Sequence, residues 1–163
     1  MKKYSQMNIK LIAIGKTDHK NLQALIEEYQ NRLYFYIKFE FDIIPDIKNV
    51  KNLSEEQQKE KEGELILAKL SPTDFLILLD ENGKSFTSIG FANELQKKMN
   101  AGIKTLVYVI GGPYGFSEAV YQKAQQKISL SKMTFSHQMV RLFFIEQVYR
   151  GFTILRNEPY HHQ

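Results

Sequence analysis

The sequence predicts an α/β fold with a mostly parallel sheet, because strand-like and helix-like segments alternate along the chain. Two of the strand-like segments, residues 74–80 and 104–110, are short and strongly apolar, as buried strands are. The chain has 163 residues and shows neither an internal repeat nor a linker that would divide it. We therefore expect a single domain over residues 1–163, with residues 1–6 as a disordered lead.

Strands are expected where short runs are continuously apolar or alternate between apolar and polar residues. In chain order these runs are residues 8–15, 37–44, 74–80, 104–110 and 127–131. Pro45 ends the second run, and the Asn82-Gly83 pair predicts a turn after the third.

Helices are expected where apolar residues recur at helical spacing or where a capping residue precedes such a run. They are residues 21–35, 54–70, 88–99, a helix that follows Ser117, and residues 137–156. Ser54 and Gln57 form a capping box for the second helix, and the polar residues 46–53 before it predict a loop. Ser117 caps the fourth helix, with Glu118 in its first turn.

The last predicted helix is apolar around its whole circumference, which is typical of a buried helix. A sheet of this size covers only one side of it. We expect the other side to meet a second copy of the chain in a homodimer. The alternative is that neighbouring helices of the same chain enclose it.

Ligands of parallel α/β sheets bind beyond the carboxyl ends of the strands. The candidate positions are therefore Leu79-Asp80, Ile110-Gly111 and Leu130-Ser131. The glycines at 111, 112 and 115 match neither a phosphate loop nor the dinucleotide fingerprint. They indicate either a close backbone approach to a ligand or simply a tight strand-to-helix turn.

Other chemistries have weaker support in the sequence. Residues 115–119 resemble the nucleophile elbow of hydrolases but lack its last glycine. A hydrolase triad of Ser117, Glu146 and His161 is therefore only weakly supported. The absence of cysteine and the spacing of the histidines make a metal site unexpected. On the last helix, Glu146 and Arg150 are spaced for a structural ion pair, whereas Arg141 suits either such a pair or an anionic substrate.

Charge and hydropathy limit the cellular location and the partners that we expect. No apolar run approaches the roughly 20 residues that a membrane helix needs, and the first residues do not form a signal peptide. We expect a cytoplasmic protein without membrane contact. The net charge of +4 permits an RNA partner without requiring one.

Three segments together resemble one family: "VIGGPYG" at residues 109–115, "SLSKMTFSHQMVRLFFIEQVYRGF" at residues 129–152, and the closing "PYHH". They are similar to the RlmH family of ribosomal large-subunit pseudouridine methyltransferases, which belong to the SPOUT class. The resemblance also includes "MNIKLIAIGK", "KEGELILAKL" and "LLDENGKSFTS", and it extends from Met7 to His162.

The resemblance implies a C-terminal trefoil knot, a homodimer and the cofactor S-adenosyl-L-methionine bound within the knot. It assigns cofactor contacts to the three loops at the strand ends. The residues that match are Leu79, Gly111, Gly112, Leu130, Ser131, Lys132, Met133, Thr134 and Phe135. In this interpretation the two glycines let the backbone approach the cofactor.

The implied reaction methylates a ring nitrogen of a pseudouridine in 23S rRNA of the assembled ribosome. The residues expected to act on the acceptor are His137, Arg141, Tyr160 and His161: Arg141 would bind the anion, His137 would orient the acceptor or transfer its proton, and the last two would close over it. Relatives commonly have proline where Ser136 stands, so the resemblance does not fix the orientation of His137. They also often have a basic residue where His162 stands, so it does not establish a phosphate contact at that position. The rival interpretations are a non-catalytic ribosome-binding factor and an enzyme that acts on a small molecule with a nucleotide cofactor.

Overall fold

The computed structural model describes residues 7–162, so the lead expected at residues 1–6 lies outside the described residues. Its centre is a five-stranded sheet in the order β2-β1-β4-β3-β5, in which each neighbouring pair runs parallel. The strands are β1 (Asn8–Ile14), β2 (Lys38–Ile44), β3 (Phe75–Ser85), β4 (Thr105–Ile110) and β5 (Gln126–Ser129). The helices are α1 (Lys20–Leu33), α2 (Glu55–Ala68), α3 (Ser88–Asn100), α4 (Glu118–Lys123) and α5 (Met139–Leu155), with a short 3-10 helix η1 (Val50–Asn52). The predicted α/β class is confirmed.

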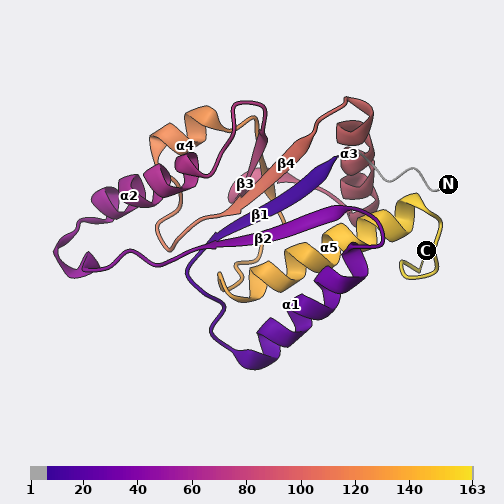
Figure 1. Ribbon diagram of the computed structural model, residues 1–163, viewed down its shortest axis with the longest axis horizontal. Coiled ribbons are helices and arrows are strands. Elements are labelled where there is room, and N and C mark those ends of the chain that lie inside the picture. The colour runs from indigo at the N-terminus through magenta and orange to yellow at the C-terminus, as the bar shows by residue number, and fades with distance from the viewer. Residues whose placement is uncertain (1–6, 163) are drawn as a thin grey trace.

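The helices form one layer on each face of the sheet. α2 and α4 lie together on one face, whereas α1, α3 and α5 cover the other (Figure 1). Side chains of successive strand residues point to opposite faces, and β4 illustrates this alternation. Val107 and Val109 belong to the buried cluster beneath α2 and α4, while Tyr108 and Ile110 belong to the cluster beneath the other three helices.

Local sequence signals account for several element boundaries. The Ser54 side chain accepts from the backbone N–H of Gln57, whose side chain accepts from the N–H of Ser54, so the predicted capping box at α2 is confirmed. Ser117 caps α4 as expected, since its side chain accepts from the N–H of Val120. The predicted loop at residues 46–53 is interrupted by η1.

The turn predicted at Asn82-Gly83 is wrong. β3 continues through this pair to Ser85, and its register against β5 shifts between Leu79 and Lys84. A Cβ at Gly83 would lie 2.6 Å from the backbone of Ile128, well inside ordinary contact distance. The glycine therefore permits the bulged strand to approach β5 closely instead of turning the chain.

The last helix is partly enclosed by its own chain. Phe144 is fully buried between Tyr108 of β4 and Phe91 of α3, with ring centroids 4.6 and 6.2 Å away respectively. Met139 and Phe143, one turn apart on the same helix, are exposed. The side of α5 that faces the sheet thus matches the alternative expectation of enclosure within the chain, and an apolar strip remains outside.

Candidate functional site

A cavity of about 700 Å³ lies beyond the carboxyl ends of β3, β4 and β5. Three chain segments that are distant in sequence form its walls. They are residues 79–82, 110–116 and 128–137 without Lys132, joined by Tyr121 and Val140. This is the position at which ligands bind in parallel α/β sheets, and its volume falls within the range of small-molecule and cofactor pockets.

Most of the predicted cofactor residues line this cavity. These are Leu79, Gly111, Gly112, Leu130, Ser131, Met133, Thr134 and Phe135. His137, predicted to act on the acceptor, lines it as well. Lys132 belongs to the same loop but is exposed and is not part of the wall.

The two glycines of the β4 loop have a packing role that sequence reasoning did not foresee. A Cβ at Gly111 would lie 3.1 Å from the ring of Phe116, and a Cβ at Gly112 would lie 2.6 Å from Oε1 of Glu62. The side of each glycine that a side chain would occupy is therefore already filled by protein. Their lack of side chains serves the packing of the loop against Phe116 and Glu62, whereas the prediction attributed it to space for a cofactor.

Glu62 is an unusual neighbour for such a loop. The residue is only 3% exposed, and Oε1 has no hydrogen-bond partner among the described residues. Burial raises the pKa of this carboxyl, Gln58 opposes the rise by hydrogen bonding, and the negative charge of Asp46 adds to it. The loop thus packs against a buried acid whose pKa is raised.

The cavity wall formed by residues 128–137 is ordered by hydrogen bonds of its serine side chains. Ser129 Oγ donates to the carbonyl of Ser131 over 2.9 Å, and Ser131 Oγ accepts from the N–H of Met133 over 2.9 Å. At the end of this loop, Ser136 Oγ accepts from the N–H of Met139, the first residue of α5, over 3.1 Å. Ser136 therefore makes an ordering contact just before His137.

Arg141 differs from its predicted role. Its side chain is fully buried, so the expectation that it faces an anionic substrate does not hold for the described structure. Nη1 donates to the carbonyl of Gly15 (2.7 Å) and to Thr17 Oγ1 (3.0 Å), Nη2 to the carbonyl of Ile14 (2.9 Å), and Nε to that of His137 (3.1 Å). Burial lowers the pKa of the guanidinium, which Asp18 and Asp46 partly offset. The residue joins the end of β1 to the start of α5.

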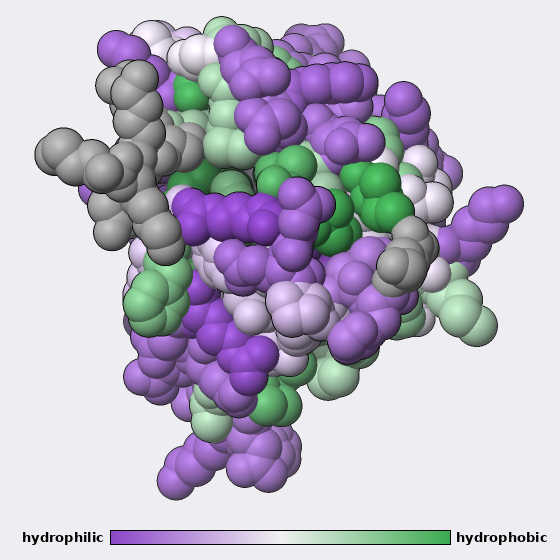
Figure 2. Space-filling model, turned by 90° about the vertical axis from the view of Figure 1, so that its right-hand side faces the viewer, coloured by the Kyte–Doolittle hydropathy of each residue, from purple (hydrophilic) through white to green (hydrophobic). Residues whose placement is uncertain are grey.

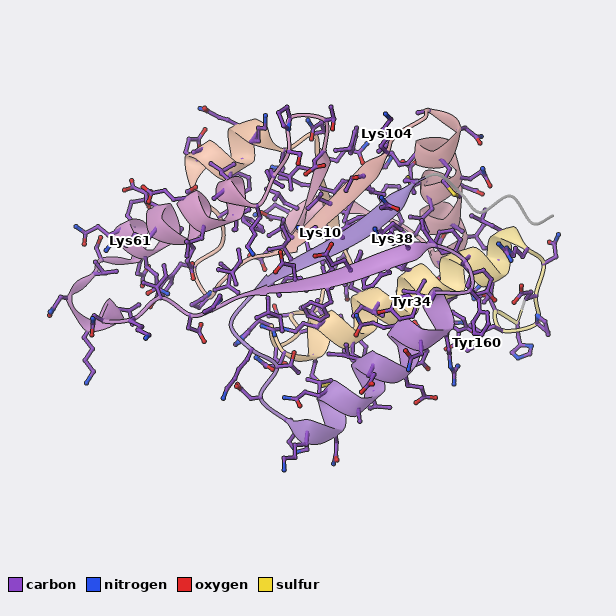
Figure 3. All side chains as sticks on the ribbon, viewed as in Figure 1. Lys10, Tyr34, Lys38, Lys61, Lys104 and Tyr160 are labelled. Carbon is purple, nitrogen blue, oxygen red and sulfur yellow. The ribbon has the colours of Figure 1, made fainter. Side chains whose placement is uncertain are left out.

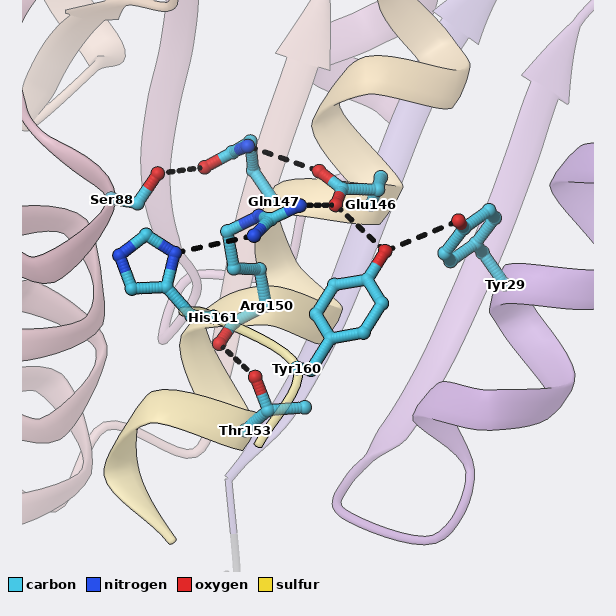
Figure 4. A network of polar contacts seen from close by, with 8 residues as sticks. All are labelled: Tyr29, Ser88, Glu146, Gln147, Arg150, Thr153, Tyr160 and His161. Atoms are coloured by element: carbon cyan, nitrogen blue, oxygen red, sulfur yellow. Dashed lines mark hydrogen bonds and ion pairs between the residues drawn. The ribbon is translucent and has the colours of Figure 1, made fainter. Parts of the chain in front are cut away.

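Tyr160 and His161 lie away from this cavity, in a network around Glu146 (Figure 4). Glu146 Oε1 accepts from Tyr160 Oη over 2.9 Å and from Arg150 Nη2 over 2.5 Å. Arg150 Nη1 in turn contacts Nδ1 of His161 over 3.2 Å, and Tyr160 Oη also contacts Tyr29 Oη over 3.2 Å. The predicted Glu146–Arg150 ion pair is confirmed. Tyr160 is labelled in Figure 3, and its contact with Tyr29 places it against α1.

The hydrolase interpretation is wrong, because its three residues do not meet. Ser117 is buried between α2 and α4, where its Oγ fills the space beside Gly63. Glu146 and His161 belong to the layer on the opposite face of the sheet.

A second cavity of about 350 Å³ shares residues 128–131 and Phe135 with the first. Its remaining walls come from residues 86–88, Phe91, Phe143, Glu146 and Gln147. Gln147 accepts from Ser88 Oγ over 2.9 Å and donates to Glu146 over 3.0 Å. The tail network therefore reaches the wall of a cavity that borders the first one.

Sequence reasoning missed several residues of the first cavity, notably Phe116 and Tyr121, and it named Asp80 only as part of a candidate strand end. Asp80 follows Leu79 directly, so the end of a buried strand was the available signal. Tyr121 lies on the short helix α4, and nothing in the sequence of that helix indicates that the tyrosine reaches the end of β3.

Within residues 7–162, no helix is long and apolar enough to cross a membrane, and no group of three or more His, Cys, Asp or Glu side chains is arranged to hold a metal ion.

Comparisons with known proteins identify the family of the chain. The family model described as "Predicted SPOUT methyltransferase" matches residues 7–161. Proteins named ribosomal RNA large subunit methyltransferase H are 81% identical in Flavobacterium johnsoniae, 78% in Flavobacterium psychrophilum and 68% in Christiangramia forsetii. Each alignment covers 96% of this chain and 100% of the relative.

Among solved structures, the SpoU methyltransferase AviRb from Streptomyces viridochromogenes, in complex with AdoMet, aligns with a TM-score of 0.44 and 13% identity. That alignment covers 88% of this chain and 57% of the other. The family assignment rests on the sequence matches, which span nearly the whole chain at high identity. The chain belongs to the ribosomal RNA large subunit methyltransferase H family of SPOUT methyltransferases.

Proposed function

We propose that this protein methylates large-subunit ribosomal RNA and that its methyl donor, S-adenosyl-L-methionine, binds in the 700 Å³ cavity at the strand ends. The observation that carries the proposal is the convergence of three loops on one cavity in a chain that belongs to a methyltransferase family. The names of its relatives support ribosomal RNA of the large subunit as the substrate.

The chemistry of the cavity wall fits this cofactor. Leu79, Ile110 and Leu130 offer apolar surface for a flat adenine ring, and the loop backbones offer donors and acceptors for its nitrogens. The carboxylate of Asp80 suits a ligand that carries hydroxyl groups. When bound, S-adenosyl-L-methionine supplies an electrophilic methyl group on its sulfonium.

The acceptor that we propose is a ring nitrogen of a pseudouridine in 23S rRNA. A bond forms between this nitrogen and the methyl carbon, the carbon–sulfur bond breaks, and the nitrogen loses its proton. His137 lines the cavity and is placed to orient the acceptor or take that proton. Arg141 acts as a positioning residue, because it ties the His137 carbonyl to the end of β1.

Tyr160 and His161 are proposed to hold the acceptor from the tail. They do not line the cofactor cavity, but their network includes Glu146 in the wall of the adjoining cavity. This arrangement separates cofactor binding from acceptor binding. Loss of the tail should therefore affect methyl transfer more than cofactor affinity.

The substrate that we propose is the assembled ribosome in the cytoplasm. A net charge of +4 gives weak attraction to free RNA, because affinity for nucleic acid rises with the number of phosphates neutralised. On the face shown in Figure 2, hydrophobic residues form small separate patches among hydrophilic ones. Recognition of a preassembled surface would supply contacts that charge alone does not.

We also propose a homodimer through the exposed strip of Phe135, Met139 and Phe143. The rings of Phe135 and Phe143 contact each other, with centroids 5.1 Å apart. Phe143→Glu should split the dimer by placing a charge in an apolar interface. Phe144 and Ile145 are unsuitable probes, because both are fully buried in the core of one chain. Light scattering measures the outcome, and a monomeric wild type at micromolar concentration contradicts the dimer.

Transfer of labelled methyl from S-adenosyl-L-methionine tests the function. The acceptors are ribosomes, separated subunits and free 23S rRNA from cells without this enzyme. We expect label in the rRNA of assembled ribosomes and little in free rRNA, with digestion to nucleosides identifying a methylated pseudouridine. Cofactor binding without transfer to any acceptor favours a non-catalytic ribosome-binding factor, and RNA-independent turnover of a small molecule contradicts the proposal.

A further inference from the structure

Asp80 is a carboxylate near the start of the first cavity-lining segment, directly after Leu79. Both of its oxygens are held by donors of the protein. Oδ1 accepts from the N–H of Asn82 over 2.8 Å, and Oδ2 accepts from Tyr121 Oη. Each carboxylate oxygen has a second lone pair, so Asp80 retains acceptor capacity toward the cavity.

Tyr121 is fixed on several sides. Its ring packs edge-on against Phe116, with centroids 5.7 Å apart, and Lys127 Nζ lies 5.4 Å from its centroid. Phe116 in turn fills the space beside Gly111. The packed glycine loop therefore supports the phenol that holds Asp80, and both Phe116 and Tyr121 line the same cavity.

The phenol remains a hydrogen-bond donor at neutral pH. Burial, the hydrogen bond to Asp80 and nearby negative charges raise the pKa of Tyr121 to about 12. The pair thus consists of a neutral donor and an acceptor whose rotamer is set by other residues of the cavity wall.

We propose that Asp80 binds the ribose hydroxyls of the cofactor and that Tyr121 is the residue that positions it. The inference rests on the proposed function. Leu79 provides apolar surface for the base, and the ribose is attached to the base, so its hydroxyls are the first donors beyond that surface. An acidic side chain performs this task for the ribose of dinucleotides in other α/β proteins.

The experiment measures binding by calorimetry, without turnover. Its probes are S-adenosylhomocysteine, 5′-methylthioadenosine, and the 2′-deoxy and 3′-deoxy forms of methylthioadenosine. Methylthioadenosine retains the ribose but lacks the amino acid. Asp80→Asn should weaken both parent ligands by about 10- to 100-fold, the scale of a hydrogen bond to a charged group. Removal of the contacted hydroxyl should weaken wild-type binding similarly but leave binding to Asp80→Asn nearly unchanged.

Glu81→Gln is the matched control. Glu81 lines the cavity next to Asp80, and this substitution removes the same negative charge as Asp80→Asn does. It should change the affinities by only a few-fold. Tyr121→Phe should weaken methylthioadenosine by about 3- to 10-fold in the wild type, the scale of a lost neutral hydrogen bond, and have no further effect in Asp80→Asn. A merely structural tyrosine would weaken binding equally in both backgrounds.

Three outcomes overturn the inference. In the first, Asp80→Asn binds both parent ligands like the wild type. In the second, it loses affinity for S-adenosylhomocysteine but not for methylthioadenosine, which assigns Asp80 to the ammonium group. In the third, Glu81→Gln is as damaging as Asp80→Asn, which assigns the effect to overall charge. Failure of the wild type to bind any of these ligands contradicts the proposed function itself.

Discussion

Gly112→Ala should destabilise the fold because the space for a Cβ is occupied by the carboxyl of Glu62. The Cβ would lie 2.6 Å from Oε1 and 2.8 Å from Cδ, whereas ordinary contacts are 3.4–4 Å. Glu62 must therefore move by at least about 0.8 Å, because Oε2 lies closer still, and its side chain is buried against the loop. Forced overpacking of this kind costs about 1–3 kcal/mol of unfolding free energy.

The cycle with Glu62→Ala tests this cause directly. Removing the carboxyl empties the space, so Gly112→Ala should cost less than about 1 kcal/mol in that background. Gly111→Ala is the graded comparison, since its Cβ would lie 3.1 Å from the Phe116 ring and needs only a small adjustment. Urea unfolding measures all variants. Equal costs of Gly112→Ala in both backgrounds would refute the packing explanation.

Three further predictions concern the buried acid, the buried arginine and the tail. Because burial raises the pKa of Glu62, the folded protein binds this proton more tightly than the unfolded chain, and stability should fall as pH rises above about 4.3; Glu62→Gln should remove that part of the pH dependence in urea titrations. Arg141→Lys should lower the unfolding free energy by about 3 kcal/mol or more, because a lysine cannot satisfy the four acceptors of the guanidinium; a loss below about 1 kcal/mol contradicts this. Truncation after Glu158 should leave cofactor affinity within a few-fold but reduce ribosome methylation by about 100-fold, and a normal rate would make the tail dispensable.

Much of the fold could be predicted because its signals are local. The apolar runs of β3 and β4 and the capping box at Ser54 depend on neighbours within a few residues. The strand order β2-β1-β4-β3-β5 is set by packing between distant segments, and no local pattern indicates it. The turn predicted at Asn82-Gly83 was wrong for the same reason, because the glycine is required by its close approach to the backbone of Ile128 on another strand.

The candidate site was predictable where it follows from strand ends. Leu79, Gly111 and Leu130 end or follow strands, and parallel strands bring those ends together. Arg141 was misjudged because a charged residue on an apolar helix does not reveal its acceptors, which here are carbonyls at the end of β1. The trefoil knot stays a prediction implied by the family.

A crystal structure with bound S-adenosylhomocysteine tests the central claim most directly. The account predicts electron density for the ligand between the loops of Leu79, Gly111 and Leu130, with its ribose beside Asp80. Density elsewhere, for example in the cavity beside Phe91 and Gln147, or no density at a saturating concentration, would contradict it.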